Sequence, residues 1–366
     1  MVGKKIIIVA NSDLTFDQRL LRISRSLKSA GYQSELWGRN FLNSEPLKTE
    51  PFPQSRISLW FQKGKLAYLE LNIRFFIKLI SAKADAVCSV DLDTLPACWF
   101  ARFFTRVKLI HDAHEYMAEV PEVYNRPVTR WIWNWIGKTM LPAVDLAYTV
   151  SQSLVDEFKK VYKKEFGLVR NIAFLNEKQE EQSPFAQESG FWVFLGAVNK
   201  GRGLEEFIPL IKQTGRKLVV MGDGDQMEEV KQLVFDLSLQ SNVLFLGKVN
   251  PELTSSILSK AGAGINLLTE EGLSYRYSLA NKFFDYVHAG IPQICIRFPE
   301  YENLMGLYEV GCLCTDMNSV SIIEAMNKIS IPENQLRYRR EAAKAREVWN
   351  WQSEEKELIR LIGTIF

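Results

Sequence analysis

The chain has 366 residues, of which 47% are hydrophobic and 24% are charged, a composition typical of a soluble globular protein and not of a disordered or fibrous one. This length is more than one ordinary core requires and predicts two domains. Residues 1–175 hold 25 basic and 17 acidic side chains, whereas the remaining residues hold 20 and 26. The two halves are therefore expected to meet different partners.

Neither an export signal nor a membrane span is predicted. The start, MVGKKIIIVA, has a short apolar run that is typical of a first strand. No run reaches the roughly 18–20 apolar residues that cross a bilayer. The odd number of cysteines, most of them in apolar segments, predicts buried, reduced thiols in a cytosolic protein. They are Cys88, Cys98, Cys295, Cys312 and Cys314.

Strand and helix patterns alternate along the first half of the chain. Strands are expected at 4–10, 33–37, 86–90, 107–111 and 146–150, and helices at 17–30, 66–81, 94–104 and 127–139. The segment Gly38–Lys65, which contains three prolines, is predicted to be a long loop. A polar stretch without periodicity, about Asn176 to Gly190, is interpreted as an interdomain linker.

The alternation restarts after that linker. Strands are expected at 191–196, 217–222, 243–247, 262–268, 291–296 and 309–314. Helices are expected from Leu204, Asp225 and Pro251, and a final amphipathic helix at 349–366. This order indicates an α/β protein with two parallel sheets.

The segment Ser274–Pro292 carries the strongest indication of chemistry. Its pattern predicts a helix over 278–288, with Ser278 as the cap. Asn281, Lys282 and Asp285 share one face of that helix, because residues three and four apart are neighbours. A cation near a helix N-terminus suits the phosphates of a nucleotide diphosphate, and Asp285 suits its ribose. The alternative is an exposed Lys–Asp ion pair.

The first turn, from Ala10 to Arg19, lacks the Gly-x-Gly-x-x-Gly pattern that holds a dinucleotide pyrophosphate, which argues against a nicotinamide dehydrogenase. Asp17 and Arg19 begin a predicted helix there. They could touch an acceptor substrate, or Asp17 could simply cap the helix with Arg19 beside it.

Two acidic motifs follow strands of the first half. Asp91 and Asp93 match a short Asp-x-Asp metal pattern but also suit a strand-to-helix cap. The segment 111–115, which reads HDAHE, lies at the carboxyl end of a strand, where α/β folds place ligands. It could bind a metal ion, act on a substrate, or hold a histidine among local carboxylates for structural reasons alone.

The helix expected at 127–139 contains RWIWNWIGK, in which Trp131 and Trp135 form a stripe beside basic residues. Aromatic and basic helices of this kind can lie in a bilayer interface. Tryptophan stripes at helical spacing can equally belong to a core. Both interpretations stay open.

Four segments, in this order along the chain, resemble motifs of the family 4 (group 1) glycosyltransferases with the GT-B fold, in the branch common in bacterial polysaccharide biosynthesis. They are 111–122, 196–206, 221–226 and the 278–292 stretch. Asp285 followed by AGIP matches the second acid of the family signature, whereas the first acid falls on Tyr277. The resemblance implies two Rossmann-like domains with parallel sheets facing a central cleft.

The resemblance also implies roles for individual residues. The catalytic set is His114, Asp112, Arg202 and Lys282, with His114 facing the donor sugar. The donor-binding set is Gly201, Gly203, Gly222, Gly224, Glu271, Ser278, Asn281 and Asp285. Asp17 and Arg19 lie on the acceptor side, Glu115 fixes the loop of His114, and no metal or other cofactor is expected.

The expected function is a retaining transfer from a nucleotide-sugar to a glycan or lipid-linked acceptor. Residues 1–175 would form the acceptor domain, with helix 349–366 crossing back to it, and 190–348 the donor domain. The alternatives are a sugar-nucleotide epimerase and a catalytically inactive donor-binding scaffold. No nucleic acid is expected as a partner. The expected location is the cytoplasm, including peripheral contact with the inner face of an anionic membrane.

Overall fold

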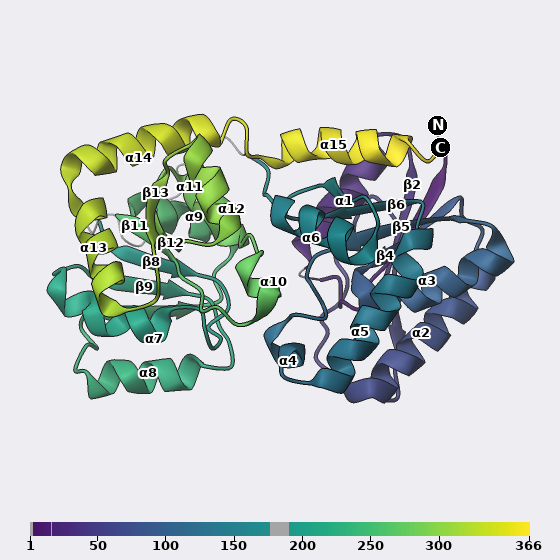
Figure 1. Ribbon diagram of the computed structural model, residues 1–366, viewed down its shortest axis with the longest axis horizontal. Helices are drawn as coiled ribbons and strands as arrows, with labels where there is room; N and C mark the ends of the chain where they lie inside the picture. The colour runs from purple at the N-terminus through teal and green to yellow at the C-terminus, as the bar shows by residue number, and fades with distance from the viewer. Residues whose placement is uncertain (1–2, 16, 176–189) are drawn as a thin grey trace. The chain divides into compact units, whose positions relative to one another are not determined.

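The computed structural model describes residues 3–15, 17–175 and 190–366, so the predicted linker lies outside the described residues apart from its last residue (Figure 1). The chain forms two compact units. The first comprises Met1–Asn171 together with Glu354–Phe366, and the second comprises Ile172–Ser353.

The described part of the first unit contains a seven-stranded sheet in which all pairs are parallel, in the order β3-β2-β1-β4-β5-β6-β7. Its strands are β1 Lys5–Val9, β2 Gln33–Asn40, β3 Gln54–Ser58, β4 Ala86–Val90, β5 Lys108–Ala113, β6 Leu146–Thr149 and β7 Gly167–Leu168. The central strands β1 and β4 are apolar and buried, as expected for strands covered on both faces.

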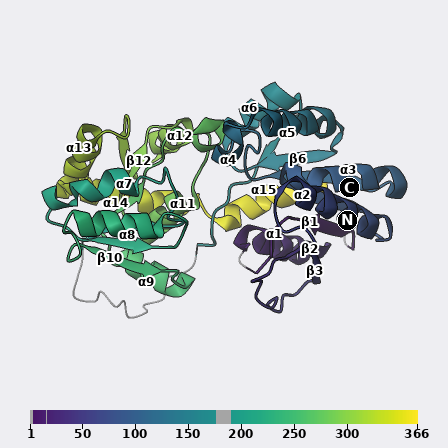
Figure 2. The same ribbon diagram turned by 90° about the horizontal axis from the view of Figure 1, so that it is seen from below.

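Helices cover both faces of this sheet. They are α1 Gln18–Ser29, α2 Gly64–Ile80, α3 Asp91–Thr105, α4 Pro121–Tyr124, α5 Pro127–Met140, α6 Gln152–Tyr162 and α15 Trp351–Gly363, with a 3-10 turn, η1, at Leu141–Ala143. Helices α2, α3 and α5 pack against one another in a single layer. Figures 1 and 2 show α15 near α1, on the opposite face of the sheet from that layer.

The predicted loop at Gly38–Lys65 is wrong in part, because it contains the edge strand β3. This strand reads QSRIS and pairs with β2 along its whole length. Its polar sequence, which follows Pro53 directly, gives no alternation of apolar and polar residues, so only the pairing with β2 reveals it.

The described part of the second unit contains a six-stranded parallel sheet in the order β10-β9-β8-β11-β12-β13. Its strands are β8 Trp192–Leu195, β9 Leu218–Met221, β10 Val243–Gly247, β11 Ala263–Asn266, β12 Gln293–Ile296 and β13 Gly311–Cys314. Its helices are α7 Leu204–Phe207, α8 Met227–Asp236, α9 Pro251–Lys260, α10 Gly272–Arg276, α11 Asn281–Ala289, α12 Pro299–Leu307, α13 Ser319–Ser330 and α14 Pro332–Ala345, with a 3-10 segment, η2, at Ile208–Gln213.

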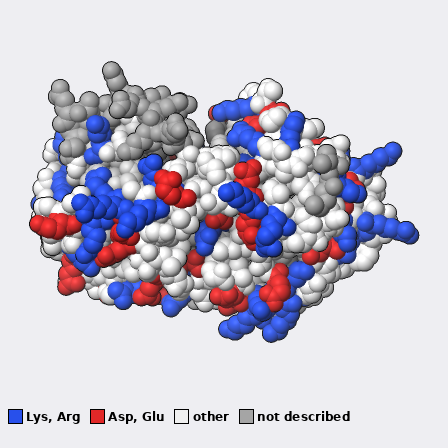
Figure 3. All heavy atoms as spheres, turned by 90° about the horizontal axis from the view of Figure 1, so that it is seen from above, with Lys and Arg blue, Asp and Glu red and all other residues white. Residues whose placement is uncertain are grey.

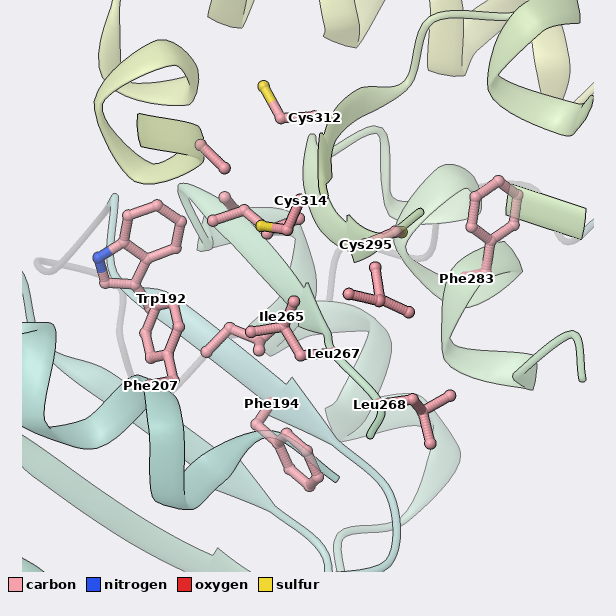
Figure 4. Packing of buried hydrophobic residues seen from close by; sticks show 14 of the residues in the cluster. Trp192, Phe194, Phe207, Ile265, Leu267, Leu268, Phe283, Cys295, Cys312 and Cys314 are labelled. Carbon is pink, nitrogen blue, oxygen red and sulfur yellow. The ribbon is translucent and has the colours of Figure 1, made fainter. Parts of the chain in front are cut away.

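The core of the second unit is built around its aromatic side chains (Figure 4). Trp192 of β8 lies against Phe207, with ring centroids 5.4 Å apart. Helix α11 approaches β11 so closely that a Cβ at Gly264 would lie 2.4 Å from the Tyr286 ring. Glycine is therefore needed there, and the contact fixes where α11 begins relative to the sheet.

All five cysteines are buried and free, as their apolar surroundings predicted. Among the described residues, no helix is both long and apolar enough to cross a bilayer.

Candidate active site

Each sheet reverses its strand order at one point, and ligands of α/β folds bind at the carboxyl ends of the strands beside such a point. In the first unit the reversal lies between β1 and β4, and in the second between β8 and β11. The motifs singled out in the sequence cluster at these two places.

The loop after β8 and the turn after β9 are in direct contact in the second unit. A Cβ at Gly222, whose φ is +143°, would lie 1.8 Å from the Gly196 carbonyl oxygen, so only glycine fits. Gly224 lies against Val198 and Asn199 of the same loop. The glycine turn therefore shapes the loop that follows β8.

Gly201 and Gly203 lie against the segment that follows β11. Both have positive φ, at +76° and +82°. Gly201 faces the Thr269 hydroxyl and Gly203 faces Leu267. The two loops at the strand reversal are thus packed together around Arg202.

Lys282, in the first turn of α11, is only 8% exposed. Its ammonium group lies over the Phe194 ring, 3.7 Å from the centroid, and no acidic side chain among the described residues forms an ion pair with it. Burial and the nearby charge of Arg202 lower the Lys282 pKa to about 7, although Cys295 and Asp285 oppose the shift. The predicted alternative of an exposed Lys–Asp ion pair is therefore wrong.

Two further polar groups of this cluster are buried without a hydrogen-bond partner in the described structure, Arg202 Nε and Thr269 Oγ1. The Arg202 guanidinium also stacks over the Tyr275 ring at 5.0 Å. Buried donors without acceptors are unfavourable and commonly mark a place where a ligand supplies the missing partner. Thr269 was not among the predicted site residues. Its position directly after a buried strand is the sequence feature that could have identified it.

The remaining predicted donor-site residues lie around α11. Ser278 does not cap the helix, because its hydroxyl donates to the Tyr275 carbonyl and α11 begins at Asn281 with no side-chain cap. Asn281 is exposed and Asp285 is half-buried one turn further on. Glu271 is partly exposed and immediately precedes α10, a short helix that the sequence did not predict.

In the first unit, Arg19, Asp112 and His114 form a tight ionic cluster. Arg19 donates to both carboxylate oxygens of Asp112, at 2.8 Å and 3.3 Å, and also to the Val169 carbonyl. His114 Nε2 lies 3.0 Å from Asp112 Oδ2 and 3.0 Å from Arg19 Nε. Both Arg19 and Asp112 are buried, so this pair is strong and rigid.

The charges in this cluster compensate one another. Burial opposes ionisation of Asp112, but Arg19 and His114 outweigh it and lower the Asp112 pKa. Burial likewise opposes protonation of His114, but Asp112 and Asp91 raise its pKa to about 9. His114 is therefore protonated at neutral pH.

Asp91 and Asp93 do not cap α3, which begins at Asp91 without a side-chain cap. Asp91 instead accepts the backbone N–H groups of His114 and Glu115, at 2.8 Å and 3.3 Å. Asp93 accepts from Asn11 at 2.9 Å. These carboxylates hold the loops after β5 and β1, so Asp91 has the loop-fixing contact that was expected of Glu115.

Asp17 caps α1, because its side chain accepts from the Leu20 N–H at 3.2 Å. His111 lies in the core, where its Nδ1 contacts the Ser89 hydroxyl at 2.9 Å. Among the described residues, no three His, Cys, Asp or Glu side chains are grouped so that they could hold a metal ion.

Two of the three tryptophans of α5 do not belong to the core. Trp131 and Trp135 are exposed, whereas Trp133, Gly137 and Met140 are the buried residues of this helix. Core packing as the explanation of the Trp131–Trp135 stripe is therefore wrong.

The model of the family described as glycosyl transferases group 1 matches residues 176–346. A curated relative, the alpha-monoglucosyldiacylglycerol synthase of Streptococcus pneumoniae, is 32% identical over 113 residues. That match covers 30% of this chain and spans only 24% of the relative's length.

Solved structures match the whole chain. Sucrose-phosphate synthase from Thermosynechococcus elongatus has a TM-score of 0.84 at 14% identity, with 99% of each chain covered. HepE from Anabaena in complex with UDP and glucose has a TM-score of 0.77 at 14% identity, covering 99% of this chain and 100% of that one. WaaG, a glycosyltransferase involved in lipopolysaccharide biosynthesis, has a TM-score of 0.75 at 13% identity, covering 96% and 98%. The chain therefore has the GT-B fold of these proteins, and residues 176–346 resemble the group 1 glycosyltransferase family.

Proposed function

We propose that the protein is a glycosyltransferase that takes a sugar from a nucleotide-diphosphate-sugar. One observation carries this proposal: Lys282 and Arg202 bring two cationic groups together at the strand reversal of the second unit, and no acid among the described residues forms an ion pair with Lys282. A diphosphate supplies the missing negative charge and the acceptors for Arg202 Nε and Thr269 Oγ1. The UDP bound in the HepE structure has this chemistry.

The same cations would assist the reaction. When the bond between the sugar and the diphosphate breaks, negative charge develops on the leaving phosphate. Lys282, Arg202 and the N-terminus of α11 stabilise that charge in a site they have already desolvated. A bound diphosphate also keeps Lys282 protonated, because it raises the pKa that burial lowers.

We assign Asp285 to the ribose, and we propose a retaining reaction that needs no metal ion. We assign none of the described side chains of the second-unit cluster the role of nucleophile, and we propose that the acceptor attacks on the face that the diphosphate leaves. Protonated His114 and its partner Asp112 are assigned to the transfer step, not to nucleotide binding.

For the acceptor we propose a glycan or lipid-linked hydroxyl compound used in cell-surface polysaccharide synthesis. Two similar proteins support this class, since one is an alpha-monoglucosyldiacylglycerol synthase and another is involved in lipopolysaccharide biosynthesis. We place the reaction in the cytoplasm, because an odd set of buried, free cysteines suits a reducing compartment.

The proposal is tested with a panel of UDP- and GDP-sugars, each first assayed for thermal stabilisation of the protein. The expected result is that one donor raises Tm and that sugar is transferred only when an acceptor is added, with or without EDTA. Conversion of the donor without acceptor would indicate an epimerase instead. Stabilisation without any transfer would indicate a binding scaffold, and activity that EDTA abolishes and a divalent ion restores would contradict the metal-free route.

A further inference from the structure

Helices α2, α3 and α5 are apolar on the side that faces away from the sheet. In α2, the stripe Ala67, Leu71, Phe75 and Leu79 is buried. The opposite stripe is apolar as well, and Ile73 and Ile77 are 49% and 55% exposed. We call the exposed side chains Leu69, Ile73 and Ile77 of α2, Phe103 and Phe104 of α3, and Trp131 of α5 the outer apolar face.

The outer apolar face is continuous, because its three helices pack side by side. Phe76 of α2 contacts Phe104 of α3 edge to face, with ring centroids 5.6 Å apart. Tyr68 of α2 contacts Trp133 of α5 in the same geometry at 5.5 Å. The exposed residues therefore lie on one layer of helices and are not scattered over the unit.

Such a surface is unusual for a protein surrounded by water alone. A helix on the surface of a domain normally presents polar residues to solvent. Here Phe104 is 71% and Trp131 is 64% exposed, in addition to the α2 stripe. Large contiguous apolar surfaces on soluble domains mark sites that bind a partner or a membrane.

The charges around the outer apolar face distinguish a protein partner from a membrane. None of the acidic side chains of α2, α3 and α5 is exposed in the described structure. Glu70 is bound by Arg74 and by the backbone N–H groups of residues 60 and 61. Lys65 and Lys138, in contrast, are exposed and form no ion pair with described residues. The surface over α14 and α15 differs, because cations and acids are mixed there (Figure 3).

We propose that the outer apolar face docks the first unit on an anionic membrane surface. Tryptophan and phenylalanine side chains enter the headgroup boundary, and the flanking lysines lie against anionic lipid. Pairing with a second copy would bring unneutralised lysines of both copies together, which is unfavourable. This docking does not depend on glycosyl transfer and goes beyond the proposed function.

The test uses flotation of the full-length protein with vesicles of phosphatidylcholine alone or mixed with phosphatidylglycerol. We expect binding only to the mixed vesicles, because charge and apolar area act together. The double substitution Ile73→Gln and Ile77→Gln should weaken that binding about tenfold or more, since it removes the apolar stripe. Lys65→Gln with Lys138→Gln should weaken it less and make it insensitive to salt.

The matched control is Val320→Gln with Leu336→Gln, two residues of the second unit that are equally exposed. This variant should bind the vesicles as the wild type does, and all variants should keep their Tm because the substituted side chains already contact water. Failure of the wild type to bind the mixed vesicles overturns the proposal, as does an equal loss in the control. A dimer in sedimentation that Ile73→Gln and Ile77→Gln dissociate would assign the face to contact between copies instead.

Discussion

The two units have polar clusters at equivalent places, but the charges are paired in the first unit and not in the second. Each places polar residues at the point where a parallel sheet reverses its strand order. In the first unit, Asp112 neutralises Arg19 and His114 through direct contacts. In the second, Lys282 lies buried beside Arg202, and none of the acids that the structure describes forms an ion pair with it.

The ionic cluster of the first unit therefore contains its own counter-charge, whereas the cationic cluster of the second unit lacks one among the described residues. A buried ion pair with good geometry holds its own elements together and needs nothing from outside. A buried cation without a partner is unfavourable for folding and persists where binding requires it. The first cluster is therefore expected to matter for stability as well as chemistry, and the second mainly for its ligand.

The largest predicted effect is on the stability of the first unit. Arg19→Met should lower the free energy of unfolding by about 3–5 kcal/mol, because it removes the buried partner that contacts both carboxylate oxygens of Asp112 and leaves only His114 beside that carboxylate. Lys282→Met should leave stability unchanged or raise it, since it removes an unpaired charge from the second unit. Urea denaturation monitored for two transitions provides the measurement. Equal destabilisation by both substitutions would contradict the comparison.

The next effect concerns phosphate binding. Lys282→Ala should weaken nucleoside diphosphate binding roughly 10- to 100-fold, because a charge-assisted hydrogen bond contributes about 1.5–3 kcal/mol. Affinity for the nucleoside alone should not change. Calorimetry with both ligands is the measurement, and Lys200→Ala, an exposed lysine of the loop after β8, is the control. Parallel loss of nucleoside affinity would remove Lys282 from the phosphate site.

Asp285→Asn should have a smaller effect than Lys282→Ala and should weaken the binding of both ligands. If Asp285 accepts hydrogen bonds from the ribose, nucleoside and nucleoside diphosphate should both lose about tenfold in affinity. The same calorimetric series measures this. A loss confined to the diphosphate would show that Asp285 acts on Lys282, whose pKa its charge raises, and not on the ribose.

The smallest effect is on the pH dependence of folding stability, to which Lys282 of the second unit and His114 of the first contribute with opposite sign. The pKa of Lys282 is about 7, below its ordinary value of 10.5, so the unfolded chain binds more protons and the Lys282 contribution to stability rises between these values. The pKa of His114 is about 9, above its ordinary 6.5, so its stabilisation is complete below 6.5 and is lost as pH rises through 9.

Diphosphate binding at pH 8 should accordingly take up a proton at Lys282 and weaken severalfold between pH 7 and 9. Calorimetry in buffers of different ionisation enthalpy measures the uptake. It should vanish in Lys282→Met and persist in His114→Gln. Proton release, or uptake that survives Lys282→Met, would assign the titration to another group.

The sequence predicted the architecture because strongly apolar strands alternate with amphipathic helices. Where local signals were weak, prediction failed. The polar edge strand Gln54–Ser58 exists through its pairing with β2. Helix α11 begins at Asn281 without the predicted cap by Ser278, and its position on the sheet depends on the close contact between Gly264 and Tyr286. Both depend on residues distant in the chain.

The candidate sites show the same limit. The positions of Lys282 and His114 were predicted from motifs, but their electrostatic states were not. Burial of Lys282 follows from how α11 meets the sheet, and the pairing of Arg19 with Asp112 joins residues 93 apart in sequence. The spacing of residues along the chain predicts neither the burial of Lys282 nor the pairing of Arg19 with Asp112. Which charges are paired could therefore be recognised only in the three-dimensional structure.

The return of α15 to the first unit has a consequence for biosynthesis. Glu354 accepts the Arg170 backbone N–H at 2.7 Å and pairs with its guanidinium, and the Phe366 ring reaches Tyr32. A ribosome adds about 5–20 residues per second, so the intervening unit delays these contacts by roughly 10 to 35 seconds. The first unit is thus begun before the second but completed after it, and its nascent surface needs protection until α15 has been made.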